Sequence, residues 1–183
     1  MWGHLLEHLS LDRTVVRYDQ RGSGLSDWEV QDISFEAWVR DLETVAEACA
    51  FERFVLFGIS QGVSVSVEYA RRNPERVSAL VLHGGYARGR LQRGGGEALR
   101  EEAQAMYKLA EVGWGRDEPS FRQFFTTQFI PGGTREQHHW FNELERISTT
   151  PQNAARMMRV FDGIDVVERL TGIQCPVIVL HAT

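Results

Sequence analysis

The sequence predicts an α/β fold, in which a mostly parallel sheet is flanked by helices and an all-helical segment is inserted before the last strand. Two observations lead to this prediction. Short apolar runs of strand length alternate with helical patterns, as buried strands of a parallel sheet do. A long stretch before the last run carries several helical patterns and no convincing strand. The four runs are residues 14–18, 54–57, 79–83 and 177–180.

Two helices are expected between the first three runs. Ser34 stands where it can cap a helix whose apolar residues follow i, i+3, i+4 and i+7 spacing from Phe35 to Cys49. The second helix is expected from Gln61 to Asn73, and Pro74 stops it. Strand, helix, strand, helix, strand is the order of a parallel α/β sheet, and we expect its strands to be covered on both faces.

The stretch from 88 to 167 is predicted to form a helical cap over the sheet. Its helices can be placed from their own capping signals and apolar residues. One helix is expected at 97–112, and a second after Ser120, with Phe121, Phe124 and Phe125 facing inward. A third is expected after the capping box Thr134-Arg135-Glu136-Gln137, with Trp140, Phe141, Leu144 and Ile147 as its apolar residues. A fourth is expected after Thr150-Pro151.

Composition excludes several classes of protein. The 183 residues are 43% hydrophobic and 25% charged, which is ordinary globular composition rather than that of a disordered chain. A net charge of −5 with no basic stripe argues against nucleic acid as a partner. The absence of an 18-residue apolar run argues against a membrane span. Cys49 and Cys175 make neither a disulfide framework nor a metal site with a nearby histidine, so we expect a reduced, cytoplasmic protein without a metal.

One motif carries chemistry. Gly58-Ile59-Ser60-Gln61-Gly62 is G-x-S-x-G, the pattern of a tight strand-to-helix turn that exposes a nucleophilic serine at the edge of a sheet. This turn is called the nucleophile elbow, or elbow for short. Ser60 is therefore the candidate nucleophile, and the backbone N–H of Gln61 is the candidate oxyanion donor. Gly58 and Gly62 are expected to leave room where a side chain would clash. The alternative interpretation is a buried serine in an ordinary strand-to-helix turn.

A second glycine motif is interpreted as a structural turn. Gly22-Ser23-Gly24 begins like a dinucleotide-binding fingerprint, but Asp27 stands where the third glycine would be and no helix opens there. Asp19 is expected to cap this turn rather than to take part in chemistry. We therefore expect no cofactor.

Residues 17–27, the Gly58–Gly62 motif and residues 69–77 together resemble segments of the α/β-hydrolase superfamily. That family has a D-x-R-G-x-G-x-S turn before the elbow and an A-x-x-x-P-E-R-V segment after the elbow helix, and both occur here in order at fitting spacing. The segments are Arg17-Tyr18-Asp19-Gln20-Arg21-Gly22-Ser23-Gly24-Leu25-Ser26-Asp27, the Ser60 elbow, and Tyr69-Ala70-Arg71-Arg72-Asn73-Pro74-Glu75-Arg76-Val77. The resemblance runs over residues 1–183.

A narrower resemblance is to a bacterial subgroup whose hydrolase-like domain stands alone or is fused to helix-turn-helix regulators or adenylate cyclases. It is carried by residues 82–90, 113–115, 129–132 and 140–143. The resemblance implies a partial α/β-hydrolase fold. Its core is residues 1–87 and 168–183, incomplete at both ends, and its cap is residues 88–167.

The resemblance also implies a catalytic acid and a histidine that this chain lacks. In the family the chain order is serine, acid, histidine, and the acid follows the strand that matches 177–180. His83 and His181 are expected at strand ends in structural roles. His138 and His139 are expected on a solvated face of the cap.

These observations give three hypotheses. The first is a serine hydrolase that splits an ester, lactone or similar acyl bond of a small molecule, with Ser60 attacking the carbonyl and the acid and histidine coming from a longer chain. The second is a ligand-sensing or interaction module that keeps the fold without turnover. The third is an inactive gene fragment with exposed strand edges.

Overall fold

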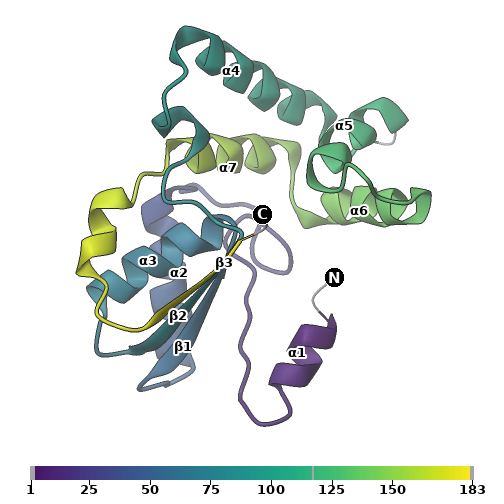
Figure 1. Cartoon of the computed structure of the whole chain (residues 1–183). Coiled ribbons are helices and arrows are strands. Elements are labelled where there is room, and N and C mark those ends of the chain that lie inside the picture. Colours follow the sequence, from purple (N-terminus) through teal and green to yellow (C-terminus); the bar gives the residue numbers. More distant parts are fainter. Residues whose placement is uncertain (1–2, 117, 182–183) are drawn as a thin grey trace.

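The computed structural model, which describes residues 3–116 and 118–181, contains a three-stranded parallel sheet with the helical segments α4 to α7 beyond one end of it (Figure 1). The strands are β1 (Phe54–Ile59), β2 (Val77–His83) and β3 (Val177–Leu180), in the spatial order β1-β2-β3. Phe57 pairs with Val81, and Val81 with Ile178, so the carboxyl ends of the strands meet at one edge. Three of the four predicted strands are therefore confirmed.

The helices also follow the predicted order. Helix α2 begins where Ser34 accepts a hydrogen bond from the Ala37 N–H at 3.1 Å, and α3 ends at Arg72, two residues before Pro74. Among the described residues, four α-helices (α4 to α7) lie between β2 and β3, and we call them the helical insertion. The elements are α1 (Gly3–Leu9), α2 (Phe35–Ala48), α3 (Gln61–Arg72), α4 (Gly96–Gly113), α5 (Pro119–Phe129), α6 (Arg135–Ser148) and α7 (Pro151–Gly163), with short 3-10 helices η1 (Arg90–Gln92) and η2 (Val167–Gly172).

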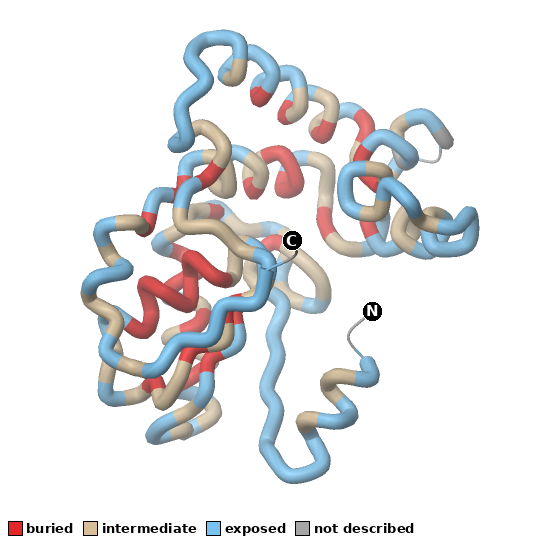
Figure 2. Tube along the Cα trace, viewed as in Figure 1, coloured by how far each residue is buried: buried red, intermediate tan, exposed pale blue. Residues whose placement is uncertain are grey.

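The main core lies between the sheet and the two helices α2 and α3 (Figure 2). Helix α3 packs on β1 and β2, and α2 packs on α3. The apolar face predicted for α2 is the face that is buried: Trp38, Val39 and Leu42 are at most 7% exposed. Burying aliphatic and aromatic side chains of this size contributes about 1.5–3 kcal/mol each, which fixes α2 and α3 against the sheet.

The prediction that the strands are covered on both faces is wrong for this structure. In β1, Leu56 is buried beneath α3, whereas Val55 is 56% exposed and Phe57 is 36% exposed. All four residues of β3 are exposed as well. The reason is that no helix in the described part of the chain packs on this second face of the sheet.

The strand predicted at 14–18 does not form. Residues 11–19 are irregular and exposed. A strand needs a neighbouring ladder for its backbone groups, and β1 is an edge strand with no described strand on its outer side. The β-branched residues that predicted this strand, Thr14, Val15 and Val16, therefore lie in the open.

Helices α4 and α7 of the helical insertion are held together by a polar contact as well as by packing. Helix α4 packs along α7. The Tyr107 hydroxyl of α4 donates a hydrogen bond of 2.6 Å to Asp162, which also pairs with Arg90 of η1 at 3.0 Å. Tyr107 is 2% exposed, so this contact is inside the insertion. The domain boundaries at 88 and 167 stay predictions.

The tip of the insertion, α5 and α6, differs from the sequence prediction in several side chains. Helix α5 begins at Pro119 without a side-chain cap, so Ser120 is not its cap. Phe125 is buried, but Phe124 is 39% exposed rather than inward. The capping box of α6 is confirmed, yet Glu145 is buried while Trp140 is 47% exposed.

His138 differs from the solvated side chain that the sequence predicts: it is partly buried, and both of its ring nitrogens have neighbours at hydrogen-bonding distance. Its Nδ1 lies 2.9 Å from the Gln123 amide nitrogen and its Nε2 lies 2.9 Å from the Ile130 carbonyl oxygen. It therefore joins α6 to α5 and the turn that follows α5. In the described ranges, no helix is long and apolar enough to cross a membrane.

Candidate active site

Ser60 lies at a strained turn between β1 and α3, as the motif predicts. Its backbone has φ 53° and ψ −124°, a conformation that side-chain-bearing residues rarely adopt. Among the described residues other than glycine, only Ala50 also has a positive φ. The turn is held by the Ser60 N–H, which donates to the His83 carbonyl at 3.0 Å, and by the Val63 N–H, which donates to the Ser60 carbonyl at 3.0 Å.

The glycines around Ser60 allow close approach of three backbone segments. A Cβ at Gly58 would lie 2.7 Å from the Gly62 carbonyl oxygen and 2.9 Å from the Val63 Cα, so no side chain fits there. The prediction that Gly62 also leaves room is wrong, because a Cβ there would meet nothing within 4 Å.

Gly85 has the spatial role expected of Gly62. A Cβ at Gly85 would lie 2.6 Å from the Ser60 carbonyl oxygen and 2.3 Å from the Val63 side chain. In the sequence, the signal for this role is the Gly84-Gly85 pair, which directly follows β2. Gly85 thus lets the loop after β2 pass directly beside the elbow.

The first turn of α3 offers a donor beside the Ser60 hydroxyl. Gln61 is the first residue of the helix, so its N–H has no partner within the helix, and no described residue accepts a hydrogen bond from it. The positive end of the helix dipole lies at the same place. Ser60 itself is exposed, which leaves its hydroxyl accessible.

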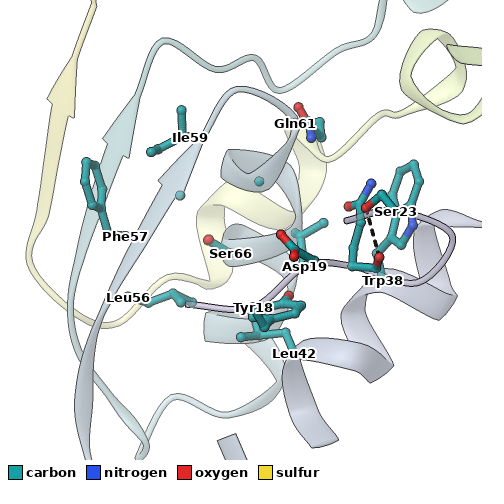
Figure 3. A pocket seen from close by; sticks show the side chains of 14 residues that line it. Tyr18, Asp19, Ser23, Trp38, Leu42, Leu56, Phe57, Ile59, Gln61 and Ser66 are labelled. Carbon is teal, nitrogen blue, oxygen red and sulfur yellow. Dashed lines mark hydrogen bonds between the residues drawn. The ribbon is translucent and has the colours of Figure 1, made fainter. Parts of the chain in front are cut away.

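A cavity of about 340 Å³ opens beside the elbow (Figure 3). It is lined by Tyr18, Asp19, Gln20 and Ser23, by Trp38 and Leu42 of α2, by residues 56–59 of β1 and by the first turns of α3. Gln61 lines it, whereas Ser60 lies next to the lining residues and is not one of them. The indole N–H of Trp38 is buried and has no hydrogen-bond partner among the described residues. The volume is that of a small-molecule site.

The turn at 19–27 forms one wall of this cavity and is structural. Asp19 accepts a hydrogen bond from the Leu25 N–H at 3.0 Å, which confirms that it caps the turn. Gly22 and Gly24 both have positive φ, as the turn requires. Arg21 clamps the turn to α2 through Asp41, with a shortest N–O distance of 2.6 Å.

The described residues do not bring a base and an acid to the Ser60 hydroxyl. His83 ends β2 and offers its carbonyl, rather than its ring, to the Ser60 N–H. Burial, together with the nearby Asp162 carboxylate, raises the pKa of Tyr86 to about 12, so this phenol keeps its proton at neutral pH. Within the described ranges, no three His, Cys, Asp or Glu side chains gather as a metal site would require.

Comparisons with known proteins agree with this geometry. A family model described as "alpha/beta hydrolase fold" matches residues 1–183. Over 85 residues the chain is 35% identical to the pyrrolizixenacetamide deacetylase of Xenorhabdus hominickii, a match that covers 46% of this chain and 32% of that protein.

Two solved structures share the fold. A hydrolase from Oleispira antarctica has a TM-score of 0.80 at 17% identity, over 97% of this chain and 66% of its own. The enol-lactonase from Burkholderia xenovorans has a TM-score of 0.76 at 20% identity, over 100% of this chain and 67% of its own. The chain thus spans about a third of the curated relative's length and about two thirds of these structures.

Proposed function

Since this chain belongs to the alpha/beta hydrolase fold family, we propose that it carries the nucleophile of a serine hydrolase acting on an ester, lactone or similar acyl bond. The single observation that carries the proposal is the conformation of Ser60, a strained φ of 53° on an exposed residue between a strand and a helix. Strain of this kind costs about 1–3 kcal/mol and persists where function requires it. A deacetylase and an enol-lactonase among the similar proteins support acyl chemistry.

In the proposed reaction, Ser60 Oγ attacks the carbonyl carbon of a small acyl substrate bound at the exposed Ser60 turn. A base takes the hydroxyl proton as the new C–O bond forms, and the carbonyl electrons move to oxygen. The Gln61 N–H then stabilises the oxyanion. Collapse of the intermediate expels the leaving group with that proton, and water releases the acid from Ser60 in the same way.

We propose that the base and its orienting acid are a histidine and a carboxylate of a longer protein. This follows the observation that, in the described part of the chain, neither group hydrogen-bonds the Ser60 hydroxyl. The share of the similar structures that the chain spans, 66–67%, fits the same proposal. For the 183-residue chain alone we expect negligible turnover, because losing one member of a triad costs about 10⁴-fold or more in rate.

Turnover of short-chain and aromatic esters tests the proposal. The protein expressed from the whole open reading frame that contains this sequence is expected to hydrolyse at least one ester, and Ser60→Ala is expected to abolish that activity. Ser120→Ala, a change at an exposed serine of the helical insertion, is the matched control and should leave the rate unchanged. Equal turnover by the Ser60→Ala protein would refute the assignment.

A ligand-sensing module without turnover is the second candidate. The observation that favours it is that no described histidine or carboxylate side chain hydrogen-bonds the Ser60 hydroxyl. It predicts that the whole protein binds acyl compounds in the cavity without hydrolysing them. Calorimetric binding without product formation would favour this candidate, whereas Ser60-dependent turnover would exclude it.

A further inference from the structure

One turn of the helical insertion is tied closely to the wall of the cavity. Residues 148–156, which end α6 and begin α7, make six hydrogen bonds to the backbone of residues 20–31, which we call the 20–31 loop. The Thr149 hydroxyl donates to Gly22 O, the Asn153 amide to Gly22 O (3.3 Å) and Trp28 O (2.8 Å), and the Arg156 guanidinium to Val30 O (2.8 Å) and Gln31 O, while the Gly24 N–H donates to Ser148 O (2.7 Å).

Asn153 is central to this network. It is 4% exposed and its side-chain amide serves two carbonyls that lie six residues apart in the loop. Its own oxygen lies 3.3 Å from Arg156 Nη1, so it also links the next donor along α7. A buried amide with several partners fixes the distance and orientation of α7 relative to the 20–31 loop, because each hydrogen bond that is not made would leave a carbonyl of the loop without a donor.

The same loop forms one side of the cavity beside the elbow. Gln20 and Ser23 line the cavity, and the Ser23 hydroxyl donates to Gln20 O at 3.0 Å (Figure 3). The Gln20 amide also lies 3.8 Å from the sulfur of Met157, in the next turn of α7 after Asn153. Gly22, whose carbonyl oxygen accepts a hydrogen bond from Asn153, directly precedes Ser23 in the sequence, and Ser23 lines the cavity.

We infer that Asn153 is a positioning residue that holds the cavity wall at a fixed place relative to the helical insertion. A displacement of α7 is passed to Gly22 and Trp28, and from there to Gln20 and Ser23. Insofar as it concerns catalysis, the inference rests on the proposed function of Ser60. The coupling itself is a property of the 183-residue chain and can be measured without turnover.

Asn153→Asp in the ¹⁵N-labelled chain tests the coupling. The change keeps the shape of the side chain but replaces its N–H donors by an oxygen that faces two carbonyls. We expect hydrogen exchange of the Gly24 amide, which is bonded to Ser148, to become about tenfold faster. The indole signal of Trp28, whose N–H donates to Gly24 O at 2.9 Å, should shift. Exchange of the Val63 amide in the elbow should stay unchanged.

Gln152→Glu is the matched control, because it makes the same chemical change at the exposed neighbour of Asn153. It should leave the Gly24 and Trp28 signals as they are. If Asn153→Asp prevents folding, Thr149→Val removes the hydroxyl donor to Gly22 and should speed Gly24 exchange by a smaller factor. Unchanged Gly24 exchange and an unshifted Trp28 signal in a folded variant would overturn the inference.

Steady-state kinetics of the Asn153→Asp protein distinguish this inference from the proposed function. In the protein expressed from the whole open reading frame, Asn153→Asp should raise KM several-fold more than it lowers kcat, since Ser60 keeps its own anchor on His83. An absence of Ser60-dependent turnover in the unaltered protein would count against the proposed function alone. Faster Gly24 exchange would still support the coupling. A variant with unaltered KM and a lowered kcat would contradict the positioning role.

Discussion

Replacing Glu145 by glutamine should stabilise the protein at alkaline pH. Glu145 lies in α6 with 6% of its surface exposed, and its Oε1 has no hydrogen-bond partner among the described residues. No described basic side chain pairs with it. Burial raises the pKa of this carboxyl to about 7, and the nearby Thr126 hydroxyl offsets that rise only in part.

The size of the effect follows from the two pKa values. In the unfolded chain the carboxyl titrates near 4.5, whereas in the folded chain it titrates near 7. Between these values the folded state binds more protons than the unfolded state, so stability falls as pH rises. Above pH 7 the loss reaches about 3 kcal/mol. For a chain of this length that corresponds to a change of roughly 6–12 °C in Tm.

Thermal unfolding from pH 4.5 to 8 measures this difference. At pH 4.5 the Glu145→Gln protein should melt close to the unaltered chain, and its advantage should grow until about pH 7 and then level off. Because all other carboxyls are common to both proteins, their titrations cancel in the difference. Glu101→Gln, on the exposed face of α4, should show no such growth. A Glu145→Gln advantage that is constant across pH would refute the reasoning.

Three further predictions concern the elbow and the insertion. Gly58→Ala should cost about 3 kcal/mol, because its Cβ would meet backbone atoms at 2.7–2.9 Å, whereas Gly62→Ala should be tolerated; urea unfolding of the two variants measures the contrast. Ser60→Gly should raise the free energy of unfolding by about 1 kcal/mol, because glycine adopts φ 53° without strain. Tyr107→Phe should lower it by about 1.5 kcal/mol, because the buried Asp162 contact of 2.6 Å is lost.

Each of these predictions has a distinct contrary result. Equal costs for the two glycine variants would contradict the close approach at Gly58. A destabilised Ser60→Gly protein would show that the turn is not strained. Unchanged stability in Tyr107→Phe would show that the Asp162 contact adds nothing to the packing of α4 on α7.

The elbow could be predicted from the sequence because its signal is local. A strand pattern, Gly58 and a helix pattern all lie within a few residues of Ser60, and each restricts the same turn. The role of Gly85 depends on the loop after β2 approaching the elbow, so the Gly84-Gly85 pair alone does not reveal which segment it lies against. Gly62 shows the converse, since a motif position was assigned a steric role that the turn does not require.

Tertiary partners explain the other differences. Residues 14–18 have the β-branched composition of a strand but no described strand beside them. In α6, a 3.6-residue period identified the helix but not its buried face, because Glu145 packs inward while Trp140 and Ile147 lie exposed. The network of Asn153 joins residues more than 120 positions apart in the chain. Such contacts leave no periodic trace in the sequence.

The most direct test of the proposed function is to map the adduct of a fluorophosphonate probe. The protein expressed from the whole open reading frame is treated with the probe, digested and analysed by mass spectrometry. We predict one adduct on the peptide that spans Gly58 to Gly62, located at Ser60, and none in the Ser60→Ala protein. An adduct that persists in Ser60→Ala, or that forms on another serine while Ser60 stays unmodified, would contradict the account.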